Sequence, residues 1–175
     1  MTRSITKEFA RYLRKGAFHP EFDDIPLFVE RALEWSDEEF LESAALLLYL
    51  VQGTEARDAT LLQWATSFET GDDLWQFSGL PVGDLALGRG PRPELSRLRQ
   101  AVALLERLAA VAEPRARPAV LSMLAWLSWA VGDSVQASAH LDAVAAIDPG
   151  YRMAAVVRGH LVDGVLPDWA IEVVE

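Results

Sequence analysis

Residues 119–151, AVLSMLAWLSWAVGDSVQASAHLDAVAAIDPGY, decide the fold that this sequence predicts. Small residues stand where two helices would cross closely, a turn residue lies between them, and a bulky apolar residue packs the second helix before a proline ends it. These residues are Ala125 and Ala137, then Gly132, Leu141 and Pro149. The stretch therefore predicts two antiparallel helices, with Gly132 at positive φ in the turn that joins them.

Apolar spacing and capping signals predict further helices on both sides of this hairpin. The stretch 94–112 repeats apolar residues in steps of three and four, at Leu95, Leu98, Val102, Leu105 and Ala109. Ser36 and Glu39 have the spacing of a capping box at the start of another helix. Other helices are expected at 4–15, 26–34, 54–71, 118–131, 134–147 and 151–163, with a short one after Pro167.

The predicted fold class is all-α, because no long alternating strand pattern occurs in the sequence. We expect an irregular helical bundle or a short α-solenoid built around the hairpin. Eight glycine and proline residues interrupt the stretch 71–93. The chain is therefore expected to form a single all-α domain over residues 1–175, either undivided or bipartite with a joint at 71–93.

The composition argues against several classes of function. The chain has no cysteine, which excludes disulfides, thiolate zinc sites and thiol catalysis. Its N-terminus lacks the pattern of a signal peptide, and its longest uncharged run, 118–132, is too short to span a bilayer. We therefore expect a cytoplasmic protein with no membrane partner.

Charge is distributed in alternating segments along the chain. The net charge is −10, and residues 21–73 alone carry −12, whereas residues 1–20 carry +4 and residues 74–118 carry +3. Such an acidic surface repels nucleic-acid phosphates, so nucleic acid is not the expected partner.

The hairpin resembles a tetratricopeptide repeat unit, and with its flanks it resembles the C-terminal part of an actinobacterial family, domain of unknown function 4192. The second resemblance covers the last 60 residues and, in outline, the last 120. It rests on Ala125-Trp126-Leu127-Ser128-Trp129, Gly132-Asp133, Ala137, Leu141, Asp148-Pro149-Gly150-Tyr151, Ala154 and Pro167 to Trp169, and more loosely on Arg57-Asp58-Ala59. It implies a helical fold in a bacterial cytoplasm, and the family name supplies no chemistry.

Four residues are the candidates for a partner surface. Trp126 and Trp129 lie three apart and share one helix face, where they either pack in the core or bind a partner. Arg97 and Arg99 make the helix 94–112 a basic counterpart of the acidic segment 21–73. This complementarity predicts weak, salt-sensitive self-association.

Residues that could carry chemistry have simpler interpretations. His19, His140 and His160 lack the spacing of a helical metal pair, so they are interpreted as surface or capping residues. The acidic cluster around Asp37 is interpreted as compensation of a helix dipole on a solvated face. We expect no catalytic residue, no metal and no cofactor.

The leading hypothesis is a non-catalytic helical module that presents a groove to a peptide, a protein or its own copy. The alternative is an acidic regulator of nucleic-acid transactions or an unrecognised enzyme, in which the segment 21–73 would occupy the groove of a basic protein.

Overall fold

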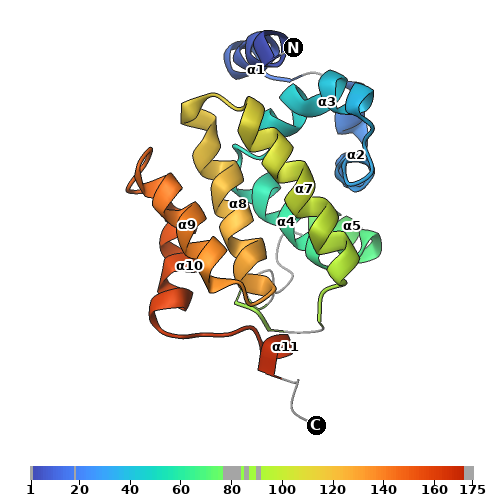
Figure 1. The fold of residues 1–175 in the computed structure, drawn as a ribbon. Coiled ribbons are helices and arrows are strands. Elements are labelled where there is room, and N and C mark those ends of the chain that lie inside the picture. The colour runs from blue at the N-terminus through green and yellow to red at the C-terminus, as the bar shows by residue number, and fades with distance from the viewer. Residues whose placement is uncertain (1, 18, 77–83, 85–86, 90–91, 172–175) are drawn as a thin grey trace.

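The computed structural model describes residues 2–17, 19–76, 84, 87–89 and 92–171 (Figure 1). Within these residues every regular element is a helix, which confirms the predicted all-α fold and its bundle architecture. Within the stretch 71–93 predicted as a joint, residues 71–76 belong to a helix, and residues 77–83, 85–86 and 90–91 lie outside the described residues.

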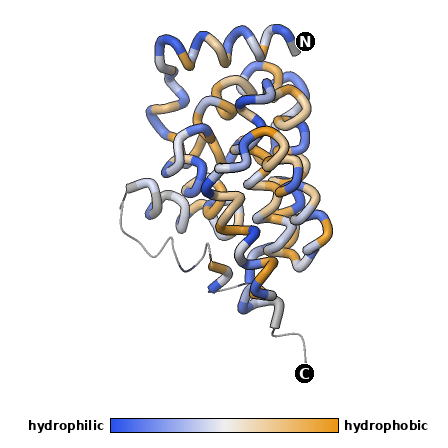
Figure 2. The backbone as a smooth tube through the Cα atoms, turned by 90° about the vertical axis from the view of Figure 1, so that its left-hand side faces the viewer, coloured by the Kyte–Doolittle hydropathy of each residue, from blue (hydrophilic) through white to orange (hydrophobic). Residues whose placement is uncertain are grey.

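The N-terminal helices pack across one end of the molecule (Figure 1). They are α1 (Thr2–Lys15), the 3₁₀ turn η1 (Pro20–Asp23), α2 (Ile25–Ala32) and α3 (Asp37–Leu50). The predicted capping box is confirmed, because the Glu39 backbone N–H donates to Ser36 Oγ (3.3 Å) and the Ser36 N–H donates to the Glu39 carboxylate (2.8 Å). Helix α1 is amphipathic, and Figure 2 shows hydrophilic and hydrophobic residues alternating along it.

The prediction of one helix over residues 54–71 is wrong. The structure has two helices in this part of the chain, α4 (Thr54–Ala65) and α5 (Phe68–Gln76). The break falls at Thr66 and Ser67, whose hydroxyl groups compete for backbone partners: Thr66 Oγ1 donates to the Leu62 carbonyl, and Ser67 Oγ accepts the Thr70 N–H (3.2 Å). The helix α4 is capped by Gly53 rather than Thr54, and Gly71 lies inside α5 rather than at a helix end.

The C-terminal helices follow the sequence prediction closely. They are α7 (Leu95–Val111), the 3₁₀ turn η2 (Pro114–Ala116), α8 (Arg117–Ala130), α9 (Ser134–Ala145), α10 (Arg152–Val162) and α11 (Asp168–Ile171). Helices α8 and α9 form the predicted hairpin, with Gly132 at φ 83° in the turn and Ala125 and Ala137 buried at the crossing. The Asp133 side chain then caps α9 by accepting the Gln136 N–H (2.9 Å).

Three of the long helices run in the same direction. The turn before α4 lies beside the start of α8, where Gln52 Nε2 donates to the Ala116 carbonyl (3.4 Å). The start of α10 also lies beside α4, because Arg57 Nη1 donates to Tyr151 Oη (2.8 Å). Helices α4, α8 and α10 therefore begin at one end of the bundle, and α7 and α9 run back between them (Figure 1).

The buried stripe of α7 differs from the predicted seam. Leu98 and Leu105 are buried as expected, but Leu95 is 41% exposed and Val102 is only partly buried. The stripe instead contains Ala101, Leu104 and Leu108, because α7 is covered on two sides, by α4 and by α8. Both helices that cover α7 belong to the same chain. Helix α1 buries Phe9 and Tyr12, whereas Leu13 is exposed.

Buried apolar residues from α1 to α11 form one contiguous cluster. The prediction of a single domain agrees with this cluster but remains a prediction. Among the described residues, no helix has both the length and the apolar character needed to cross a membrane.

Replacing Gly132 by alanine should destabilise the protein by about 1 kcal/mol, because an L-residue is strained at positive φ. A Cβ at this position would meet no atom within 4 Å, so the cost comes from backbone conformation alone. Gly150→Ala is the matched control, since Gly150 also lies in an exposed turn but has no positive φ. Urea denaturation measures both, and equal free energies of unfolding for the two variants would contradict the prediction.

Candidate functional site

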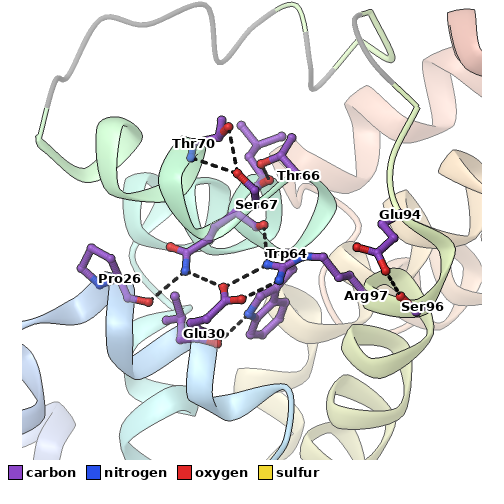
Figure 3. Close-up of polar contacts among 12 residues, drawn as sticks. Pro26, Glu30, Trp64, Thr66, Ser67, Thr70, Glu94, Ser96 and Arg97 are labelled. Carbon is purple, nitrogen blue, oxygen red and sulfur yellow. Dashed lines mark hydrogen bonds and ion pairs between the residues drawn. The ribbon is translucent and has the colours of Figure 1, made fainter.

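Arg97, one of the predicted partner-binding residues, is engaged inside the molecule (Figure 3). Its guanidinium forms a two-point ion pair with the Glu30 carboxylate of α2, with Nη2 to Oε2 at 2.9 Å. The same Nη2 donates to the Gln63 carbonyl of α4 (3.1 Å). Only 17% of the Arg97 side chain and 24% of the Glu30 side chain are exposed, so this pair is shielded from solvent.

Gln63 is the centre of this network and is fully buried. Its Nε2 donates to the Pro26 carbonyl (2.9 Å) and to Glu30 (3.0 Å), and its Oε1 accepts the Trp75 indole N–H (3.2 Å). Gly71 lies directly against this side chain, where a Cβ would approach Gln63 Cγ to 2.2 Å. The sequence-predicted helix end at Gly71 is thus explained differently, by close packing of α5 on α4.

The network stabilises the fold most strongly at neutral pH. Burial raises the pKa of the Glu30 carboxyl, but hydrogen bonds from Arg97 and Gln63 and the Arg97 charge outweigh burial, so the pKa lies below its usual value. A carboxyl with a lowered pKa contributes stability above its unfolded-state pKa and loses it as the pH falls through the folded-state value.

A second ion pair also joins the acidic segment to α7. Arg107 Nη2 donates to the Asp37 carboxylate (2.8 Å), and the Arg107 guanidinium lies 4.1 Å from the centre of the Phe40 ring. The charge complementarity that predicts self-association is therefore used, at least at these two pairs, within one chain.

Trp126 and Trp129, the other predicted candidates, are buried in α8 with ring centres 6.0 Å apart. Trp129 donates its indole N–H to the Val165 carbonyl (2.8 Å) and stacks on His160. These contacts agree with the packing interpretation of the two indoles. Arg99 is exposed and lines an outer hollow of about 710 Å³ between α7 and α9, together with His140.

The most complete candidate site is a groove of about 540 Å³ between the three parallel helices, which we call the inner groove. Helix α4 forms one wall, α10 forms the other, and Trp126 of α8 lies at its base. The lining residues are Gln52, Thr54, Arg57, Asp58, Leu61, Leu62, Trp126, Asp148, Gly150, Tyr151, Arg152, Met153, Val156 and Val157.

The polar end of the inner groove is organised by Arg57, which is only 5% exposed. Its Nε donates to the Asp58 carboxylate (2.8 Å), and its Nη1 donates to Tyr151 Oη (2.8 Å). A buried guanidinium is costly unless it is paired, and Asp58 supplies the compensating charge. Because Tyr151 Oη accepts from Arg57, its own O–H proton can be donated toward the groove.

The other end of the inner groove is apolar. Val156 is 53% exposed on the wall of α10, and Met153 is half-buried beside it. The Ser122 hydroxyl of α8 donates to the Ala119 carbonyl (2.8 Å), and its oxygen lies 3.3 Å from the Met153 sulfur. The groove thus offers an accessible apolar surface next to a small set of fixed polar groups, an arrangement suited to binding a side chain.

The described residues hold no group of three or more His, Asp or Glu side chains that could bind a metal ion. His19 accepts the Glu21 N–H and caps η1, as predicted for a capping histidine. His160 is buried against Trp129, so its interpretation as a surface or capping residue is wrong.

The second wall and the base of the inner groove lie in a segment that matches a known protein family. Residues 82–168 match the family described as Domain of unknown function (DUF4192). This match confirms the predicted resemblance of the C-terminal region to that family. No match was found among curated proteins or among solved structures.

The DUF4192 segment contains α7 to α10, and with them Arg97, Trp126 and Tyr151. Helix α4, which carries Arg57, precedes the segment in the chain. The inner groove is therefore completed by a helix outside the DUF4192 match.

Sequence reasoning did not identify Arg57 and Tyr151 as site residues, because they are 94 positions apart. A signal was nevertheless present. Tyr151 belongs to Asp148-Pro149-Gly150-Tyr151, a motif of the predicted resemblance that lies within the matched residues, whereas Arg57-Asp58-Ala59 lies outside them.

Gly71→Ala should destabilise the protein by about 1–3 kcal/mol, because the added methyl group would displace Gln63 from a site where three hydrogen bonds fix it. Gly159→Ala is the control, since Gly159 also lies within a helix but has open space around its Cβ position. There the substitution should stabilise the protein by about 0.5–1 kcal/mol. Thermal unfolding distinguishes the two, and stabilisation by both would contradict the close packing.

Proposed function

We propose that the protein is a non-catalytic helical module that binds a peptide segment of another protein in the inner groove. The observation that carries this proposal is the groove itself, walled by parallel helices, with exposed Val156 next to the Arg57–Tyr151 pair. Helical repeat proteins commonly present such a surface, formed by successive helices of one direction, to their partners.

The chemistry of the inner groove defines the kind of segment that would fit. An apolar side chain of the partner would lie on Val156 and Met153, next to the indole of Trp126. Hydrogen-bond acceptors of the partner, such as backbone carbonyls, would meet the Tyr151 hydroxyl and the exposed Arg152. Apolar contact would supply most of the affinity, and the polar end would set the register of the peptide.

The alternative, an acidic regulator that occupies the groove of a basic protein, has less support. Several carboxylates of the segment 21–73 have structural roles in this fold. Asp24 caps α2, Glu39 completes the capping box of α3, Glu30 pairs with Arg97 and Asp37 pairs with Arg107. These four carboxylates are engaged within the fold, which leaves fewer of them to imitate phosphates.

Val156→Glu should weaken peptide binding at least about tenfold, because a carboxylate would replace the central apolar contact of the groove. Val162→Glu is the matched control: Val162 lies on the same helix, is 78% exposed and does not line the groove. Peptide ligands selected from a display library on the unaltered protein would be titrated against both variants by fluorescence polarisation.

Circular dichroism would verify that both variants remain folded. Selected peptides that bind the Val156→Glu protein as tightly as the unaltered one would place the binding surface elsewhere. Peptides that lose affinity equally for both variants would indicate a general effect of added negative charge, which also contradicts the proposal.

A further inference from the structure

The segment after α10 forms a strap, residues 163–169, that crosses the C-terminal end of α8. Three hydrogen bonds hold it, each 2.8 Å long: Trp129 Nε1 donates to the Val165 carbonyl, Trp169 Nε1 donates to the Ala130 carbonyl, and the Asp168 N–H donates to the Gly88 carbonyl. Trp169, the last residue of the strap, is buried. Both indole contacts join the strap directly to α8.

Close packing adds to these hydrogen bonds. A Cβ on Gly88 would lie 2.6 Å from Trp129 Cη2 and 2.8 Å from Pro167 Cα, and Gly88 has φ 76°. Only glycine fits this position, because both the space and the backbone conformation exclude a side chain. The strap, Gly88 and the Trp129 ring thus form one tight cluster.

His160 lies beneath this cluster. Its ring stacks on Trp129, with ring centres 4.8 Å apart and planes 24° apart, and its backbone carbonyl accepts the Val165 N–H (2.8 Å). The residue is 9% exposed, and its Nε2 atom is buried with no hydrogen-bond partner among the described residues. The imidazole is therefore a buried titratable group next to Trp129, the residue of α8 to which the strap is attached.

Few charges are available to stabilise a protonated imidazole here. Burial lowers the pKa of His160 from its usual 6.5, and Asp163, at the start of the strap, opposes this effect only in part. Helix α8 presents the uncharged Trp129 ring to the imidazole, and on α9 the Asp142 carboxylate is engaged by Arg158 (2.9 Å). His160 is therefore neutral at pH 7.

We propose that the strap is an acid-released latch, in which protonation of His160 detaches residues 163–169 from the end of α8. A protonated ring would carry an N–H at Nε2 that finds no acceptor in this buried place, and such a group is expensive to keep desolvated. The ring gains hydration by leaving the Trp129 face, and Trp129 is also the residue that holds the Val165 carbonyl.

Release would open an apolar slot at the end of the bundle. A hollow of about 350 Å³ already lies beside the strap, lined by Leu95, Leu98, Ala130, Leu166 and Trp169 among others. Leu95, Val131 and Leu166 are exposed there in the closed state. Removing Leu166 and Trp169 would join this hollow to the buried end of α8. This device is separate from the inner groove and does not depend on the proposed function.

Thermodynamic linkage gives the direction in which pH shifts the equilibrium between the closed and the open strap. The open strap has a histidine of ordinary pKa and the closed strap has one of lowered pKa, so acid favours opening. Below pH 6.5 the ratio of open to closed strap should rise by up to about tenfold per pH unit, until the pH reaches the pKa of the closed state.

Hydrogen exchange of the Trp129 and Trp169 indole N–H groups, followed by NMR from pH 7.5 to 5.5 and corrected for intrinsic exchange, tests the latch. The unaltered protein should lose protection at both indoles with acid. His160→Gln, which cannot be protonated, should keep pH-independent protection, and His140→Gln, which changes a histidine on α9 away from the strap, should behave like the unaltered protein.

Protection that does not change with pH in the unaltered protein, or that changes equally in the His160→Gln protein, would overturn the proposal. If that variant does not fold, titration of the His160 ring resonances in the unaltered protein decides. A midpoint below 6.5 that coincides with loss of indole protection supports the latch. A midpoint above 6.5 would show that attraction between imidazolium and the indole face dominates, and the latch would be rejected.

Discussion

The ion pair between Glu30 and Arg97, with the buried Gln63 side chain beside it, links the two halves of this bundle, which are the N-terminal helices α1 to α5 and the C-terminal helices α7 to α11. It connects α2, α4 and α7 at one point, close to where α4 ends and α7 begins. Because α4 also carries Arg57 and one wall of the inner groove, the geometry of the candidate site depends on this docking. The ion pair is partly buried, so losing one partner leaves the other desolvated without compensation.

The two ends of the bundle differ in the interactions that organise them. At the end where α4 and α10 begin, the buried guanidinium of Arg57 bridges two helices and leaves an open groove. At the opposite end, Trp129 and Trp169 attach the strap through backbone carbonyls. The first arrangement leaves a groove accessible in the folded state, whereas the second keeps the Trp129 and Trp169 rings covered. The acidic segment 21–73 supplies the Glu30 and Asp37 carboxylates that pair with α7.

Signals that act over a few residues were sufficient to predict much of the fold. The capping box at Ser36 and the turn at Gly132 are local, and the structure has both. The break between α4 and α5 was not predicted, because the side-chain hydroxyl groups of Thr66 and Ser67 outweigh an apolar pattern that continues through them. Trp126 was predicted as a candidate partner-binding residue, but the groove around it was not. The contacts of Arg97 with Glu30 and of Arg57 with Tyr151 span 67 and 94 positions, and periodicity carries no information about them.

A double-mutant cycle on Glu30→Gln and Arg97→Met, measured as the free energy of unfolding in urea, tests the central role of this pair most directly. The pair Asp37 and Arg107 serves as a control, because its carboxylate is fully exposed and should show little coupling. The account predicts a coupling energy of about 1–3 kcal/mol between Glu30 and Arg97. Additive effects of the two substitutions would contradict it, and would mean that the halves are held together by apolar packing alone.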